Sequence, residues 1–170
     1  MEPLNREMWK FMRMRPANFP TIRIAQFAYL IYKSSGLFSK IMEVNSVAEI
    51  YDLFKIKLHH YWKEHYRFAQ LSKIRNKTLG KTTIDLLIIN TIVPFLFLYG
   101  RLRGGEAYRD RALLLLESLP PEKNSIISKW NALGMTADSA YRTQAMLQLK
   151  NEYCSKKRCL ECAVGNAILR

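Results

Sequence analysis

The sequence predicts an all-α fold: one compact domain of about six or seven helices around a buried central helix that is kinked at a proline. Two observations indicate this class. Apolar residues recur at helical spacing in five segments, and no stretch shows the alternation of a strand. The chain has 170 residues and is 49% hydrophobic, which suffices for a sizeable core. We divide it into a basic, aromatic N-terminal arm at 1–19 and a helical domain at 20–170.

The arm at 1–19 mixes aromatic and basic side chains, and Pro16 interrupts any helix within it. We expect its aromatic residues either to pack on the body of the protein, or to meet nucleic acid or the rest of a larger protein. Pro20 suits the first turn of a helix that runs to about Ser34. The core face predicted for this helix contains Ile24, Ala25, Ala28 and Ile31.

A capping box begins the next main helix. The Ser46 hydroxyl is expected to accept a hydrogen bond from the backbone amide of Glu49, whose carboxylate reaches back to the cap. From there apolar residues keep helical spacing as far as Leu58, so this helix should pack on the core.

The most apolar helix is predicted at 84–98. This run is 15 residues long and contains Asp85 and Asn90, whereas a membrane span needs about 20 apolar residues. We therefore interpret it as the central core helix, kinked at Pro94, and expect no transmembrane segment.

Further helices are predicted at 106–119, 124–133 and 136–153. The last helix is expected to begin near Cys159, with apolar residues repeating at helical spacing. Its predicted core face contains Leu160, Ala163, Val164, Ala167 and Ile168.

The charge balance points to an anionic partner. Lys and Arg total 27 against 14 Asp and Glu, a net charge of +13 that attracts nucleic acid, acidic membrane surfaces or acidic proteins. The most basic segment is 55–81, where Glu64 is the one acid and cations alternate with aromatic rings. Cations of this kind bind phosphates and the rings stack on bases. The predicted nucleic-acid-binding residues are Lys55, Lys57, Lys63, Arg67, Lys73, Arg75, Lys77, Tyr61 and Trp62. The alternative is a solvated helix face and linker, with the rings in the core.

All three cysteines of the chain lie close together near its end, at Cys154, Cys159 and Cys162, with three cations between the first two. Thiolates bind soft metals and act as nucleophiles. Structural zinc takes four ligands, so an imidazole, another chain or an exogenous group has to supply the fourth. We predict a zinc site of the three cysteines and His65, with an iron–sulfur cluster as the next choice. The alternative is that these cysteines are small core residues or free thiols.

Two features favour a cytoplasmic protein with reduced thiols. Three cysteines cannot form a complete disulfide framework. The first residues are polar and charged, without the apolar stretch of a secretion signal.

Three stretches carry a family resemblance, at 9–26, 61–66 and 148–165. They resemble the C-terminal half of an uncharacterised family, the domain of unknown function number 2851, over nearly the whole chain. The resemblance implies no assigned activity. It also implies that longer members have an additional N-terminal half, rich in strands and loosely similar to a restriction-type nuclease core. On that resemblance, the catalytic carboxylates lie outside this chain.

We therefore expect a basic helical module that binds nucleic acid, or assists in doing so, without a catalytic centre of its own. Two alternatives stay open. One is a zinc or iron–sulfur protein with an enzymatic or redox role, and the other is a structural domain whose basic surface binds an acidic protein. Salt-dependent binding of an oligonucleotide separates the first hypothesis from the last, and metal analysis bears on the other.

Overall fold

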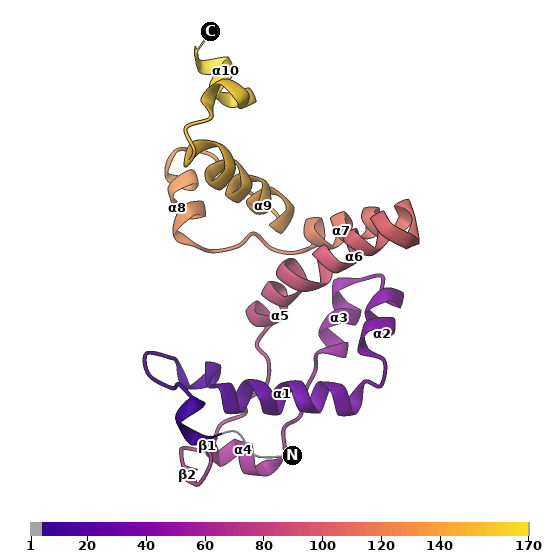
Figure 1. The fold of residues 1–170 in the computed structure, drawn as a ribbon, viewed down its shortest axis with the longest axis vertical. Coiled ribbons are helices and arrows are strands. Elements are labelled where there is room, and N and C mark those ends of the chain that lie inside the picture. The colour runs from indigo at the N-terminus through magenta and orange to yellow at the C-terminus, as the bar shows by residue number, and fades with distance from the viewer. Residues whose placement is uncertain (1–4, 170) are drawn as a thin grey trace. The chain divides into compact units, whose positions relative to one another are not determined.

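The computed structural model describes residues 5–169 (Figure 1). Residues 1–4 of the predicted arm, and the last residue of the predicted helical domain, lie outside this range. Helices dominate the described chain and its one sheet has two short strands, so the predicted all-α class is confirmed. When helices that run into one another are counted once and 3-10 turns are left out, the described residues form nine helices, against the six or seven predicted.

The chain divides into two compact units, Met1–Ile84 and Asp85–Arg170. Each has buried apolar residues of its own. In the first unit these include Phe19, Ile22, Leu30, Ile50, Phe54 and Ile56. In the second they include Ile88, Ile92, Leu96, Leu115, Leu119 and Ile127.

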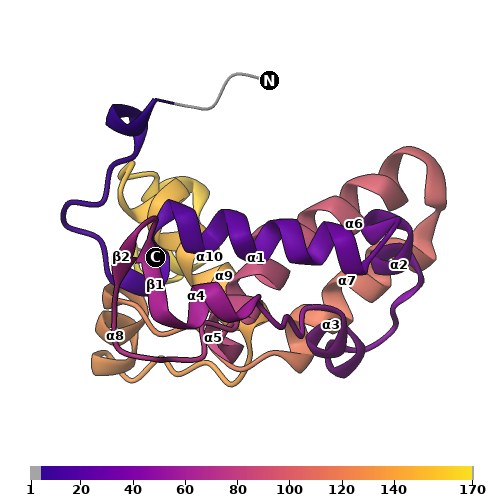
Figure 2. The same ribbon diagram turned by 90° about the horizontal axis from the view of Figure 1, so that it is seen from below.

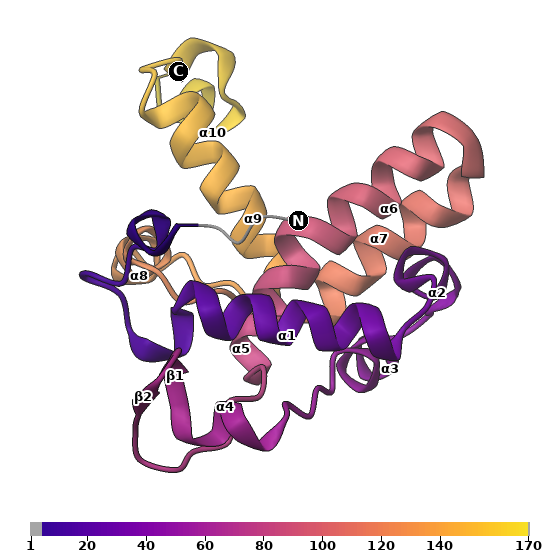
Figure 3. The same cartoon turned by 60° about the horizontal axis from the view of Figure 1, so that its bottom comes forward.

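The first unit is arranged along α1 (Figure 1). The hairpin lies beside the N-terminal half of α1, and α2 and α3 lie by its other end (Figures 1 and 3). Two 3-10 turns, Arg6–Met8 and Pro16–Asn18, precede α1. The elements are α1 (Pro20–Lys33), α2 (Leu37–Glu43), α3 (Val47–Leu53), α4 (His60–Glu64), β1 (His65–Arg67) and β2 (Gln70–Leu71).

Helix α1 begins and ends as predicted, but its predicted core face is wrong. Ile24, Ala28 and Ile31 are exposed. The buried residues are Thr21, Ile22, Gln26 and Leu30. The helix turns a partly polar face inward because two of these side chains hydrogen-bond backbone carbonyls of the segment that contains the hairpin.

The capping box at α3 forms. The Ser46 hydroxyl oxygen accepts from the Glu49 amide at 3.3 Å, and the Glu49 carboxylate accepts from the Ser46 hydroxyl at 2.7 Å. That carboxylate also accepts from the Asn45 amide at 3.4 Å, so it reaches one residue beyond the predicted cap. Helix α3 ends at Leu53, earlier than the predicted Leu58.

The central helix is longer than predicted and contains two π-helical stretches. Pro94 is the second residue after the first of them. A proline has no amide hydrogen and its ring presses on the carbonyl four residues earlier, so the wider π turn accommodates it. The four segments are α5 (Lys81–Leu87), η3 (Ile88–Ile92), α6 (Val93–Tyr99) and η4 (Gly100–Gly104).

By length and composition alone, the 23-residue helix Lys81–Arg103 is suited to crossing a membrane, and it is the one such helix among residues 5–169. A core helix of a soluble protein passes the same test. Ile88, Ile92 and Leu96 are buried among the other residues of the chain, but only 39% of the most apolar stretch of this helix is buried. One such helix is weak evidence for a membrane span, and the absence of a transmembrane segment stays an expectation.

The rest of the second unit follows a sharp turn at Gly105, whose φ of +79° lies in the region that favours glycine. Helix α7 then runs beside α6 (Figures 1 and 2). Helix α9 continues without a break into the π stretch η5. The elements are α7 (Glu106–Ser118), α8 (Ser125–Ala132), α9 (Ala140–Gln148), η5 (Leu149–Cys154), the 3-10 turn η6 (Cys159–Glu161) and α10 (Ala163–Leu169).

The prediction for the last helix is wrong in its start and in its core face. Helix α10 begins at Ala163, after a 3-10 turn at the cysteines. The whole predicted core face is exposed: Leu160, Ala163, Val164, Ala167 and Ile168. Periodicity identifies an apolar face, but it does not say whether the chain itself covers that face.

Candidate nucleic-acid interface

Helix α4 and the β1–β2 hairpin carry most of the predicted nucleic-acid-binding residues. Strand β1 follows α4 directly (Figure 3). Pairing extends past the two short strands, because the Ser72 amide donates to the Glu64 carbonyl at 2.7 Å and the Arg75 amide donates to the Lys63 carbonyl at 3.0 Å. The two arms of the hairpin therefore stay paired, with irregular register, over residues 63–75.

Two polar side chains of α1 fix this hairpin region to the body of the first unit. The Thr21 hydroxyl donates to the Tyr66 carbonyl at 2.5 Å, and the Gln26 side-chain amide donates to the Lys77 carbonyl at 2.9 Å. Both side chains belong to buried residues, where an unpaired polar group would be costly. They therefore define where the hairpin region lies on α1.

Lys77 is buried, with 7% of the residue exposed. Its ammonium donates to the carbonyls of Trp62 at 2.6 Å and Lys63 at 2.8 Å, and lies 4.0 Å from the centre of the Tyr66 ring. Burial lowers the pKa of Lys77, while the charge of Glu64 acts in the opposite direction. The residue ties the segment after the hairpin to the end of α4, so we interpret it as a structural cation.

The aromatic residues of this region form a connected set. Tyr61 stacks on His65 with ring centres 4.0 Å apart, and its hydroxyl accepts from the Ala69 amide at 3.0 Å. Trp62 meets Phe68 edge to face at 5.4 Å. Phe68, at the turn of the hairpin, is 63% exposed. Tyr61 thus supports the turn, whereas Phe68 offers a ring to solvent.

Five of the predicted cations are exposed, and the hairpin brings three of these together on its two arms: Lys63, Lys73 and Arg75. Lys55 lies 3.8 Å from Asp52, but both side chains are mostly exposed, so this ion pair is weak. The five exposed cations are Lys55, Lys57, Lys63, Lys73 and Arg75.

Arg67 is engaged with the arm. Its guanidinium lies 4.4 Å from the centre of the Phe11 ring and 5.1 Å from that of Phe19, and the two rings meet edge to face at 4.9 Å. A guanidinium that lies over the faces of two aromatic rings is attracted electrostatically to each ring. Phe11 and Phe19 of the arm thereby contact the hairpin, which agrees with the first of the two alternatives for the arm, packing on the body of the protein.

Cys154 ends η5, Cys159 begins the 3-10 turn η6, and Cys162 directly precedes α10. All three are free thiols. Cys154 and Cys159 are exposed, while Cys162 is buried. Gly165 lies so close to the Cys159 backbone that an added Cβ would come within 2.2 Å of its carbonyl oxygen. A glycine is therefore required there for α10 to pack against the 3-10 turn.

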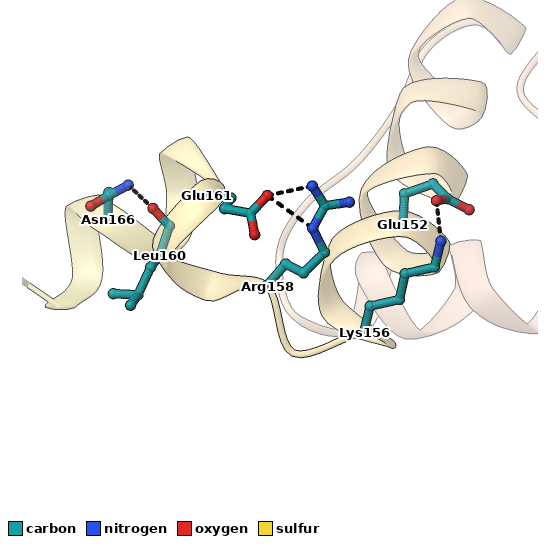
Figure 4. Close-up of polar contacts among 6 residues, drawn as sticks. All are labelled: Glu152, Lys156, Arg158, Leu160, Glu161 and Asn166. Carbon is teal, nitrogen blue, oxygen red and sulfur yellow. Dashed lines mark hydrogen bonds and ion pairs between the residues drawn. The ribbon is translucent and has the colours of Figure 1, made fainter.

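Two of the three cations between the first two cysteines are paired with carboxylates (Figure 4). Lys156 binds Glu152, and Arg158 binds Glu161 through two guanidinium nitrogens. The second pairing raises the pKa of Arg158 and lowers that of Glu161. Lys156 and Arg158 therefore form local ion pairs that stabilise the turn around the cysteines.

Among residues 5–169, no group of three or more His, Cys, Asp and Glu side chains is arranged to hold a metal ion. His65 belongs to the first unit and the cysteines belong to the second. Its Nδ1 contacts the Tyr61 carbonyl at 2.9 Å, at the end of α4. The zinc set of Cys154, Cys159, Cys162 and His65 stays a prediction.

The metal prediction has a direct test in protein purified without oxygen. A structural site would carry about one equivalent of zinc or iron per chain, and Cys162→Ser would release it and lower the melting temperature. Less than about a tenth of an equivalent, with melting unchanged by a chelator, would reject the site.

Sequence reasoning missed the residues that position the interface. The core face predicted for the helix at 20–34 consists of apolar residues, so it includes neither Thr21 nor Gln26. The hairpin has strands of three and two residues, too short for an alternation to appear. Its turn contains Ala69 at a φ of +56° instead of the glycine or asparagine that usually signals such a turn.

Comparison with known proteins identifies a family but no activity. The family model described as Protein of unknown function (DUF2851) matches residues 1–125, which include the whole hairpin and end before the cysteines. No curated protein and no solved structure gave a match to the chain.

Proposed function

This chain belongs to the DUF2851 family of proteins of unknown function, and we propose that it is a nucleic-acid-binding unit whose interface is the hairpin and α4 of the first unit. The observation that carries the proposal is the set of exposed cations on the two arms of the hairpin, together with the exposed ring of Phe68 at its turn. Glu64 is the one acid between residues 55 and 81.

The distribution of charge supports this choice of surface. Residues 1–84 hold fifteen Lys and Arg against six Asp and Glu, a net charge of +9, whereas residues 85–170 hold twelve against eight, a net charge of +4. The first unit therefore carries most of the positive charge of the chain. Such a concentration attracts polyanions and raises their local concentration.

Single-stranded nucleic acid fits better than duplex. Cations that follow a backbone bind either form, but an exposed ring stacks on a base only when that base is unpaired. Phe68 is such a ring, and Lys63, Lys73 and Arg75 lie on the same hairpin. The alternative, an acidic protein partner, would use the cations but has no need of the ring.

Reversing two hairpin charges tests the proposal. Lys73→Glu with Arg75→Glu is expected to weaken binding of a labelled single-stranded oligonucleotide by at least about tenfold at low salt, because two phosphate contacts are lost. Fluorescence anisotropy measures the affinity. The matched control, Lys123→Glu with Lys129→Glu in the second unit, has the same net charge and should change affinity less than about threefold.

Three results would count against the proposal. Failure of the wild-type chain to bind any oligonucleotide at low salt rejects nucleic-acid binding. Equal weakening by the two double variants means that net charge, and not the hairpin, governs binding. Tighter binding of an acidic peptide than of the oligonucleotide favours the protein-partner alternative.

A further inference from the structure

A cavity of about 250 Å³ lies beside α4 in the first unit. Three pieces of chain form its walls: residues 56–58 before α4, residues 62–63 near the end of α4, and residues 76–78 after the hairpin. The buried ammonium of Lys77 joins two of these walls through its hydrogen bonds to the carbonyls of residues 62 and 63. The Lys77 ammonium therefore holds one wall of the cavity to another, while the exposed residues Lys57, Lys63, Asn76 and Thr78 complete the lining.

The polar side of the cavity suits an anion. Every charged residue in its lining is a lysine: Lys57, Lys63 and Lys77. Lys57 and Lys63 are exposed, so their ammonium groups are free to reach a ligand at the opening, whereas Lys77 is held in the wall. Asn76 and Thr78 add neutral donors. Charge-assisted hydrogen bonds from lysines to phosphate oxygens are the strong contacts that such a lining provides.

The other side of the cavity is apolar. Ile56 is buried there, and Leu58 and the Trp62 ring are half-buried. An indole ring and a leucine next to two exposed lysines match a ligand that joins a phosphate to a flat ring. A nucleotide is such a ligand, because its phosphate takes the cations and its base takes the aromatic surface.

We propose that this cavity binds one nucleotide of a single strand, with the phosphate on Lys57 and Lys63 and the base against Leu58 and Trp62. This inference rests on the proposed function, since it assigns a subsite within the same interface. The volume is just below the range of about 300–1,000 Å³ for drug-sized ligands, so one nucleotide fits better than a larger cofactor. Arg75 directly precedes the wall at residues 76–78, so the strand would continue along the hairpin cations.

The test titrates the full ¹⁵N-labelled chain with adenosine monophosphate and follows the three tryptophan indole signals by NMR. Trp62→Phe identifies the signal of Trp62. Adenosine monophosphate is expected to shift this signal and the backbone amides of residues 56–58 and 76–78, but not the indoles of Trp9 and Trp130. Lys57→Met with Lys63→Met should raise the Kd by at least about tenfold, because charge-assisted hydrogen bonds are lost. Lys123→Met, at an exposed lysine of the second unit, should leave the Kd within about twofold.

A second variant keeps the test decisive if the lysine variant fails to fold. Asn76→Trp adds bulk at an exposed lining position, so it should block adenosine monophosphate without disturbing the core. Gln70→Trp, an exposed residue of β2 outside the cavity, is its control. Melting curves of all variants confirm that they are folded.

The outcomes distinguish failure of the proposed nucleotide subsite from failure of the proposed nucleic-acid interface as a whole. If the oligonucleotide binds but adenosine monophosphate shifts nothing at the cavity, the subsite is rejected and the proposed function stands. If neither binds, both are rejected. An equal effect of inorganic phosphate at the same concentration overturns recognition of the base, and an equal effect of a glutamate peptide overturns the assignment of a nucleotide.

Discussion

Replacing Leu96 with alanine is expected to lower the free energy of unfolding of the second unit by about 2–5 kcal/mol. Leu96 lies in the central helix with 1% of its surface exposed, where α6 packs along α7. Truncation removes buried apolar surface and leaves a cavity that the neighbouring residues only partly fill. Denaturant unfolding followed by Trp130, in a background with Trp9→Phe and Trp62→Phe, reports on this unit.

The adjacent residue is a matched control. Phe95 is 57% exposed, so Phe95→Ala should change the free energy of unfolding by less than about 1 kcal/mol. If Phe95→Ala lowered the free energy of unfolding as much as Leu96→Ala, or more, then Leu96 would not be the residue of this pair that the central helix buries.

Lys77→Met is expected to destabilise the first unit by about 1–3 kcal/mol, a large effect for a lysine. The methionine keeps the length of the side chain but removes the ammonium that donates to the carbonyls of Trp62 and Lys63. The Trp62 carbonyl loses this donor, whereas the Lys63 carbonyl keeps its hydrogen bond from the Arg75 amide. The contact of the ammonium with the Tyr66 ring is lost as well. Lys73→Met, at an exposed position of the same segment, should change stability by less than about 0.5 kcal/mol.

Because the pKa of Lys77 is lowered, the difference in free energy of unfolding between wild type and Lys77→Met depends on pH. Its ordinary value is 10.5, and burial lowers it in the folded chain. Between the lowered pKa and 10.5 the unfolded chain binds more protons than the folded chain, so the free energy of unfolding rises with pH in that window. The difference between wild type and Lys77→Met should therefore widen as pH rises towards 10.5 and stay constant well below the lowered pKa. A difference that narrows in that window would contradict the burial of the charge.

Local signals in the sequence predicted local structure well. Pro20 fixes the start of α1 because its missing amide is not needed in the first turn, and the Ser46 box fixes the start of α3. Each signal acts within one turn of helix. The apolar run at 84–98 likewise identified the central helix, although not its extension to Gly104, where π turns and two arginines replace the apolar pattern.

Long-range contacts were beyond such reasoning. The inward face of α1 depends on carbonyls of Tyr66 and Lys77, which lie 45 residues from Thr21 and 51 residues from Gln26. The sequence of α1 alone therefore does not predict these hydrogen-bond partners. The exposed face of α10 shows the same limit, since its apolar spacing is indistinguishable from that of a covered helix.

The candidate site was predicted as a list of residues but not as a geometry. The basic segment identified all five exposed cations, yet it placed Lys77 and Arg67 beside them as equals. The structure gives these two residues other partners: backbone carbonyls for Lys77 and two phenylalanine rings for Arg67. Charge predicts attraction to polyanions, whereas burial decides which cations are available to bind them.

The salt dependence of oligonucleotide binding tests the central claim most directly. Each lost phosphate contact on a single strand reduces the slope of log K against log salt by about 0.7. We predict that Lys63→Ala, Lys73→Ala and Arg75→Ala together make the slope shallower by about 2, while Lys123→Ala, Lys129→Ala and Arg142→Ala together leave it unchanged. A slope that is the same in the wild type and the first triple variant, or that changes equally in both variants, would contradict an interface on the hairpin of the first unit.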